Sequence, residues 1–465
     1  MNQEDSLRTE IHQVLDEVSG PTPDLMPEIA QRLRPASRRR PLLAIGQVAA
    51  VLAIALVVGG VVFAMHRSRQ TAQGPLVSTS PTTPVAAGPG ANIAWVIGQT
   101  PNHADVVTGI DPAGHVVGTI NAPVELRSPV GAHLYALSSG AVDVYSAVDG
   151  HREQTIRLHA VRADVPSLPL LSPDGRYLTV TEGSPTTLEV VDLSLGRSLA
   201  SIRVDSVAYG AAVIDAQAQH VYVMGGSSLA KLSFDGATLR VEQQAAAPPC
   251  DGLSLGGGNT SGGLPFRLLA DGRTFVAFCP GDGRVSWFDL VSMKLTHEVV
   301  VEHRNPFWVS PVFSVDGNTL YLHEGGTGKL HAVDLLQQKI VKSTKVAIAD
   351  TNPLAWLRSL LVTDADAGGI PRTAALSPDG SWLYAIGAFG APGGVSLVHL
   401  PDLSVKGRWL PEGLFTSVWV SADGQTIYLH TEGGNELRVL RTDGSPVATL
   451  SLTADWSDFI APTVP

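Results

Sequence analysis

The sequence has few cysteines, few aromatic residues and few charges for its length. Two of its 465 residues are cysteines, 6% are aromatic and 16% are charged. Two cysteines are too few for the dense disulfide framework that holds small secreted domains together. Lys and Arg number 32 against 43 Asp and Glu, which gives a net charge of −11 and argues against binding to a phosphate backbone. We therefore expect no nucleic-acid partner.

Glycine and proline are abundant by contrast. The chain holds 47 Gly and 32 Pro, and 44% of its residues are hydrophobic. This composition suits many short strands joined by tight turns better than it suits a helical protein. The length exceeds one ordinary domain, but a ring of repeats can use it as a single unit.

The amino-terminal part differs from the rest. In residues 1–41, Leu7, Ile11 and Leu15 recur at helical spacing and Gly20 ends the pattern. This predicts a short cytoplasmic helical stub. Its apolar surface is too small to form a core of its own, so we expect it to be partly disordered or to order on a partner.

Residues 42–65 form an uncharged apolar run that is long enough to cross a bilayer of about 30 Å. Five Arg residues closely precede the run and two closely follow it, which favours a cytoplasmic amino terminus. A cleaved secretory signal, with Val62 and Ala64 at the cleavage site, is the alternative. Residues 66–90 are rich in Ser, Thr and Pro and predict a disordered linker. The lipid bilayer is thus the first expected partner, and residues 91–465 are expected outside the cytoplasm.

One turn motif recurs through residues 91–465. Its best copy is Ser-Pro-Asp-Gly at 172–175, where Pro presets the turn, Asp bonds to the backbone and Gly takes the left-handed conformation. Three residues after the turn glycine an apolar strand residue follows. The relatives of this motif lie at 269–272, 314–317, 377–380 and 421–424.

Aligned on this turn, the chain forms eight units that repeat roughly every 44 residues. Longer intervals coincide with loop-like insertions at 245–263 and 349–369. A third strand recurs as well, for example LEVVDL at 188–193. The pattern predicts an all-β propeller of about eight four-stranded blades, with seven as the alternative. Unit one lacks its innermost strand, and we expect residues 458–464 to supply it, with 85–87 as the rival segment.

The SPDG turn, the LYAI, LYLH or VYVM strand and the VVDL strand resemble the YVTN family of bacterial β-propellers, which are akin to WD-repeat-like propellers. The resemblance spans about residues 90–460, although no intact Val-Thr-Asn signature occurs and Ala218 replaces one turn glycine. It implies a ring of seven or eight blades outside the cytoplasm, a fold that often serves as a binding module.

Polar residues within the repeats have structural interpretations. Asp192, Asp289 and Asp334 each end a third strand before a hairpin, where a carboxylate can accept backbone N–H bonds. Cys250 and Cys279 can pair if their compartment is oxidising, which would contribute about 3 kcal/mol. The alternative is two unpaired, small hydrophobic residues.

No catalytic residue, metal ligand set or cofactor site emerges. His323 and His430 occupy equivalent repeat positions, but no third ligand matches them. The acids at 364 and 366 lack the later bidentate Glu of an EF-hand calcium loop. The Gly-x-Ser-x-Gly string at 252–256 lacks the strand-to-helix setting of a nucleophile elbow.

Trp308 and Trp356 lie in irregular stretches, and exposed aromatic residues there would suit a recognition face. The leading hypothesis is therefore a non-catalytic binding, scaffold or sensor module with an unidentified protein, glycan or small-molecule ligand. The alternative is a propeller enzyme, lactonase-like or quinone-dependent dehydrogenase-like, with its site in the central funnel.

Overall fold

The computed structural model describes residue 88 and residues 90–460, with gaps at 101–103, 130, 139, 162–168, 208–209, 216, 218, 226, 248–265, 270, 280–282, 302–308, 325–326, 347–372, 388–392, 432–435 and 453–456. The predicted stub, the apolar run and most of the linker lie outside these residues. Within the described part of the chain, no helix has both the length and the apolar character needed to cross a membrane.

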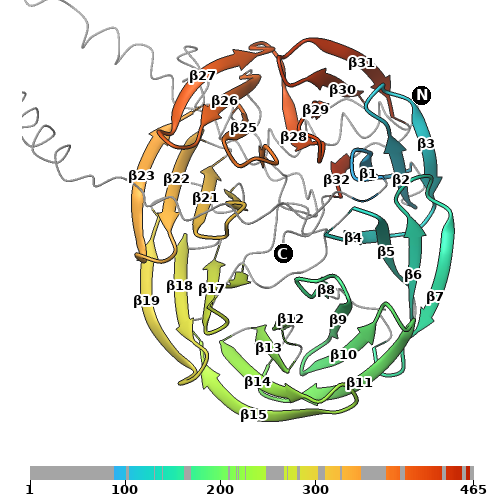
Figure 1. The fold of residues 1–465 in the computed structure, drawn as a ribbon, viewed down its shortest axis with the longest axis vertical. Coiled ribbons are helices and arrows are strands. Elements are labelled where there is room, and N and C mark those ends of the chain that lie inside the picture. The colour runs from blue at the N-terminus through green and yellow to red at the C-terminus, as the bar shows by residue number, and fades with distance from the viewer. Residues whose placement is uncertain are drawn as a thin grey trace, which may run out of the picture. The chain divides into compact units, whose positions relative to one another are not determined.

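The described residues form eight four-stranded antiparallel sheets. Figure 1 shows them around a common centre, with β4, β8 and β12 near the middle and β7, β11 and β15 on the rim. This confirms the all-β propeller and the count of eight blades; the alternative of seven is wrong. Core clusters of buried residues join consecutive blades, so each sheet packs face to face with its neighbours.

From the centre outwards, the strands of blades 1 to 4 are as follows. Blade 1 holds β32 (Ser457–Phe459), β1 (Ala94–Gln99), β2 (Asp105–Ile110) and β3 (Val116–Ile120). Blade 2 holds β4 (Val124–Arg127), β5 (His133–Ser138), β6 (Ala141–Ser146) and β7 (Arg152–Arg157). Blade 3 holds β8 (Leu170–Leu171), β9 (Tyr177–Glu182), β10 (Thr186–Asp192) and β11 (Arg197–Val204). Blade 4 holds β12 (Ala211–Ile214), β13 (His220–Gly225), β14 (Ser228–Phe234) and β15 (Leu239–Ala246).

Blades 5 to 8 continue in the same order. Blade 5 holds β16 (Phe266–Leu268), β17 (Thr274–Cys279), β18 (Arg284–Asp289) and β19 (Lys294–Val300). Blade 6 holds β20 (Val309–Phe313), β21 (Thr319–Glu324), β22 (Lys329–Asp334) and β23 (Lys339–Lys345). Blade 7 holds β24 (Ala374–Leu376), β25 (Trp382–Ile386), β26 (Val395–His399) and β27 (Ser404–Trp409). Blade 8 holds β28 (Phe415–Val420), β29 (Thr426–Thr431), β30 (Glu436–Arg441) and β31 (Pro446–Ser451).

The recurring turn joins the first and second strands of a blade. In blade 7 the Ser377 hydroxyl donates to the Asp379 carboxylate at 2.5 Å and accepts the Trp382 N–H at 2.9 Å. Gly380 donates its N–H to the Ser377 carbonyl at 2.9 Å and has φ +70°, so the turn needs glycine there. The turns that begin at Ser172, Ser314 and Ser421 repeat these bonds.

The acids that end the third strands act as predicted. Asp192 accepts the backbone N–H groups of Ser194 at 2.9 Å and Leu195 at 3.0 Å, and it pairs with the Arg176 side chain. Asp289 and Asp334 accept two backbone N–H bonds each in the same way. These carboxylates are therefore committed to the hairpin that follows each third strand.

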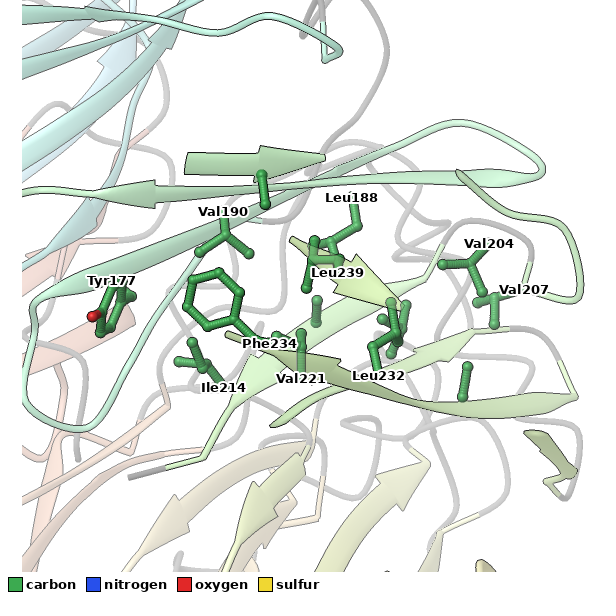
Figure 2. Close-up of a cluster of buried hydrophobic side chains, with 14 residues drawn as sticks. Tyr177, Leu188, Val190, Val204, Val207, Ile214, Val221, Leu232, Phe234 and Leu239 are labelled. Carbon is green, nitrogen blue, oxygen red and sulfur yellow. The ribbon is translucent and has the colours of Figure 1, made fainter. Parts of the chain in front are cut away.

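The core lies between the blades. Figure 2 shows one such cluster, where Leu188 and Val190 of blade 3 pack against Val221, Leu232 and Phe234 of blade 4. Successive side chains of a strand point alternately to the preceding blade and to the following blade. Every blade is therefore apolar on both faces, which explains why so many strands are continuous hydrophobic runs rather than alternating ones.

The carboxyl-terminal segment closes the ring as predicted. β32 pairs antiparallel with β1, with Phe459 opposite Val96, and the Ile460 N–H donates to the Trp95 carbonyl at 2.8 Å. Phe459 is 0% exposed and shares a cluster with Trp419 of blade 8. The rival segment at 85–87 lies outside the described residues. One strand from the end of the chain thus completes the blade that the beginning of the chain starts.

The beginning of the described chain is fixed at the same seam. Tyr428 of blade 8 donates its hydroxyl to the Asn92 carbonyl at 3.0 Å, and the Asp423 N–H donates to the Asn92 side chain at 2.9 Å. Arg127 of blade 2 donates to the Gly90 carbonyl at 2.6 Å, and its guanidinium lies over the ring of Trp419 in blade 8. Contacts from blades 2 and 8 therefore hold the entry of the chain into blade 1.

Candidate binding face

The ring has two unlike ends. The strands of a blade alternate in direction. First and third strands therefore start on the side of the ring on which second and fourth strands end. The described residues before and after each connection between blades lie on this side, which we call the loop face; the connections at 248–265, 302–308 and 347–372 are themselves outside the described residues. The recurring Ser-x-Asp-Gly turns belong to the opposite side, the turn face. The entry residues 90–92 bond to the turn that contains Asp423, so they lie at the turn face.

Most sequence-predicted site residues belong to connections between blades that the structure does not describe. Trp308, Trp356 and Cys250 lie outside the described residues, as do the acids at 364 and 366, so their roles stay predictions. Cys279 ends β17 at the loop face, is 2% exposed and is disulfide-bonded. Its predicted pairing with Cys250 stays a prediction because that residue is not described.

A buried polar chain links blades 6 and 7 at the loop face. His323, near the end of β21, has its Nδ1 2.8 Å from the Thr373 hydroxyl. Thr373 precedes β24 and donates both its hydroxyl and its backbone N–H to the Ser310 hydroxyl, each at 2.9 Å. All three residues are 0% exposed. The residue that follows the 347–372 connection is thus fixed to the preceding blade through side chains.

The direction of these bonds assigns the tautomer of His323. The Thr373 hydroxyl has one proton, which it gives to Ser310, so its oxygen accepts from His323 Nδ1. The lone pair of the neutral ring is then on Nε2, which has no hydrogen-bond partner among the described residues. Burial lowers the pKa of His323 to about 4, because a proton on Nε2 would be enclosed without water.

His430 occupies the equivalent position in blade 8. Each histidine lies opposite a serine of the first strand, since Ser310 pairs with His323 and Ser417 pairs with His430. The Nδ1 of His430 lies 2.8 Å from the hydroxyl of Thr416 in its own blade. Its Nε2 and the Ser417 hydroxyl have no hydrogen-bond partner in the described part of the structure. Burial lowers the pKa of His430 to about 4.

The two histidines differ in partner because the next blades differ. In blade 7 the Thr373 carbonyl accepts from Ile386 of the second strand, and in blade 1 Phe459 pairs with Val96 at the corresponding position. The side chain of Phe459 has no hydroxyl to accept a hydrogen bond, so His430 bonds within its own blade. The predicted equivalence of the two positions is confirmed. Across the described residues, no group of three or more His, Cys, Asp or Glu side chains is arranged to hold a metal.

A second device at the loop face was not predicted from sequence. Glu189 of β10 is 0% exposed and accepts three backbone N–H bonds, from His159 at 2.8 Å, Ala160 at 2.9 Å and Val161 at 3.0 Å. These residues follow β7, so the carboxylate of blade 3 holds the connection that leaves blade 2. An acid within an otherwise apolar third strand, LEVVDL, was the available signal.

Both groups of buried side chains bond to residues that adjoin a connection between blades. The Ser310–Thr373–His323 chain and Glu189 are both enclosed, and both end on residues that adjoin a connection between blades. Buried side chains of neighbouring blades therefore fix residues 159–161 and Thr373, at which two of the connections begin and end.

Comparison with known proteins finds likeness to solved structures only. No protein-family model matches the sequence, and no curated protein matches it at a significant level. Dihydro-heme d1 dehydrogenase NirN, solved in complex with DHE, aligns with a TM-score of 0.52 at 16% identity, over 82% of this chain and 78% of that one. BamB from Moraxella catarrhalis aligns with a TM-score of 0.47 at 13% identity, over 71% of this chain and 89% of that one. At such identities the likeness concerns the fold alone. The chain is an eight-bladed β-propeller.

Proposed function

We propose that this chain is a membrane-anchored propeller of the YVTN kind, which acts outside the cytoplasm as a binding, scaffold or sensor module. Its ligand is an unidentified protein, glycan or small molecule, and the loop face is its binding surface. The observation that carries the proposal is that the described residues flanking the connections between blades lie at one end of the ring, whereas the other end carries short, repeated turns. Loops placed on a rigid scaffold are where binding residues concentrate.

Two further features support a binding role. Buried side chains fix the beginning or end of connections: Glu189 holds residues 159–161, and Ser310 with His323 holds Thr373. Such preorganisation lowers the entropy that a loop loses when it binds a partner. In addition, the described chain enters the ring at the turn face, opposite the side on which the connections between blades begin and end.

The test exchanges connections without altering the ring. Residues 348–371 are replaced by a short Gly-Ser linker in one variant, and residues 251–263 in a second. As a matched control, the exposed turn at 235–238 in blade 4 is replaced in the same manner. We expect that cross-linking of whole cells followed by mass spectrometry recovers a partner with the wild type and the control, and loses it with at least one loop variant.

Circular dichroism of each variant must first match the wild type, which shows that the ring is folded. Partner recovery that is unchanged in both loop variants would contradict a binding role for the loop face. Protease protection of residues 91–465 in intact cells tests the location, because digestion only after the cells are opened would contradict a position outside the cytoplasm.

The competing function is an enzyme with a site in the central funnel, whose residues come from several blades. Incubation of the purified chain with lactones, and with pyrroloquinoline quinone plus alcohols, distinguishes the two. Turnover above that of heat-inactivated protein would favour the enzyme, and no turnover with retained partner binding would favour the binding module.

A further inference from the structure

We propose that His323 and His430 form an acid-sensitive device that loosens the loop face at two inter-blade interfaces, between blades 6 and 7 and between blades 8 and 1. The proposal concerns the ring itself and does not depend on the ligand. It starts from an asymmetry within each imidazole: Nδ1 is bonded to a threonine, and Nε2 is enclosed with no partner among the described residues.

The enclosure is nearly complete at both sites. His323 is 0% exposed and His430 is 5% exposed. His323 lies on the same strand face as Tyr321, in the cluster shared by blades 6 and 7. His430 lies on the same strand face as Tyr428, in the cluster shared by blades 8 and 1. A charged imidazolium at either site would need water, and water can enter only if the interface opens.

No described carboxylate is placed to stabilise an imidazolium at either site. Facing His323 are Ser310, Thr373 and Tyr321, and burial raises the pKa of that tyrosine to about 12, so it keeps its proton. Glu324 is the next residue of β21, so its side chain points to the opposite side of the sheet. There its carboxylate accepts from the Thr327 hydroxyl at 2.5 Å.

The surroundings of His430 are alike. Facing it are Ser417, Thr416 and Tyr428, and burial raises the pKa of the tyrosine hydroxyl, so it stays neutral. Arg127 of blade 2 lies over the ring of Trp419 and bonds to Gly90, at the turn-face end of this interface. Glu436 at the start of β30 is engaged by Arg438 at 2.7 Å.

The sign of the effect follows from proton linkage. Both histidines have a pKa of about 4 in the folded chain against 6.5 as the ordinary value. The unfolded chain therefore binds more protons between these values, and stability falls as the pH falls from about 6.5 towards 4. The exposed His151 has the opposite sign, since hydrogen bonding to Asp149 raises its pKa. His323 and His430 are thus expected to contribute a loss of stability on acidification, as buried, uncharged imidazoles do.

The structural consequence is local to the loop face. Protonation of His323 at Nε2 keeps its Nδ1–H bond to Thr373 but places a charge in the enclosed interface, which must then open to water beside the residue that follows the 347–372 connection. Protonation of His430 disturbs the seam that Phe459 closes. Both events act near the start of a first strand and the end of a second strand. His323 and His430 both lie at the loop-face ends of their strands, so we expect acidification to loosen that end of the ring.

The test uses the full chain in detergent micelles. The variants are His323→Asn, His430→Asn and the double substitution, because an amide N–H can replace the Nδ1 donor without titrating. His115→Asn is the control, since its side chain is 77% exposed. Urea unfolding is followed at pH 7.5, 6.0 and 4.5. We expect the wild-type folded-to-unfolded ratio to fall by roughly 20- to 80-fold per histidine over this range, and the double variant to lose most of that dependence. A double variant with the wild-type pH dependence would overturn the proposal.

A measurement on the unaltered chain covers the case in which a variant does not fold. Hydrogen exchange, corrected for the intrinsic effect of pH, is compared at pH 7.5 and 5.0. We expect protection to fall at residues 373–376 and 415–418, which adjoin the two histidines at the loop face. Residues 177–182 in blade 3, which lack an enclosed histidine, should change little. Equal changes at all three segments, or none at any, would overturn the proposal.

Discussion

Removing the side chain of Phe459 should open the ring at its closing seam. The phenyl group is 0% exposed and lies in one cluster with Val96, Trp419 and Tyr428, which come from blades 1 and 8. β32 comprises only Ser457–Phe459, and Phe459 is the residue that this strand contributes to the cluster. The strand therefore has few other contacts that could compensate for a loss.

The expected magnitude follows from this burial. Truncation of a fully buried phenylalanine to alanine typically costs about 3–5 kcal/mol, through lost transfer energy and a residual cavity. We expect Phe459→Ala to lower the free energy of unfolding by that amount. Phe459→Leu should lose less, since most of the apolar volume remains.

Urea unfolding followed by tryptophan fluorescence measures the loss, because Trp419 lies in the same cluster. Val291→Ala is the matched control, since this side chain is 68% exposed and its removal should change stability by no more than about 0.5 kcal/mol. A loss of less than 1 kcal/mol for Phe459→Ala would refute the reasoning. It would mean that the tail is not packed between blades 1 and 8.

Three further predictions concern the turns and the buried acids. Gly175→Ala should destabilise the ring more than Gly272→Ala: both have positive φ, but a Cβ at 175 would meet Pro129 at 3.0 Å, whereas nothing lies within 4 Å at 272. Equal losses in thermal melting would show that the contact is unimportant. Asp192→Asn should cost about 1–3 kcal/mol and reduce the stability lost in acid. Burial opposes ionisation of Asp192, but hydrogen bonds from Ser194, Arg176 and Leu195 outweigh this effect and lower its pKa. The contribution of Asp192 to stability therefore falls as the pH drops below about 3.8. An unchanged acid limb in urea titrations would contradict this. Glu189→Gln should speed hydrogen exchange at residues 159–161 by at least about tenfold, and unaltered exchange would mean that the carboxylate does not hold this connection.

The turns and the third strands were predictable because their chemistry is local. Ser377, Asp379 and Gly380 bond within one short segment, so the same three residue types recur wherever the turn recurs. The closing strand was predictable for a different reason. Unit one lacked an inner strand while the chain continued past unit eight, and an open ring would leave two sheet edges unpaired.

The polar chain at the loop face was beyond sequence reasoning. Ser310 and Thr373 lie 63 positions apart in sequence, and only the packing of blade 7 on blade 6 brings them together. The equivalence of His323 and His430 was visible, but their different partners depend on whether the next blade presents Thr373 or Phe459. Glu189 likewise bonds to residues of the preceding blade, 28 to 30 positions away.

Hydrogen exchange at the closing strand tests the account most directly, because it needs no substitution. The Ile460 N–H donates to the Trp95 carbonyl, and β32 pairs with β1. In the native full chain at neutral pH we predict that the amide of Ile460 exchanges as slowly as amides of interior strands such as β29. Exchange at the rate of a free carboxyl-terminal tail would contradict a ring closed by its two ends.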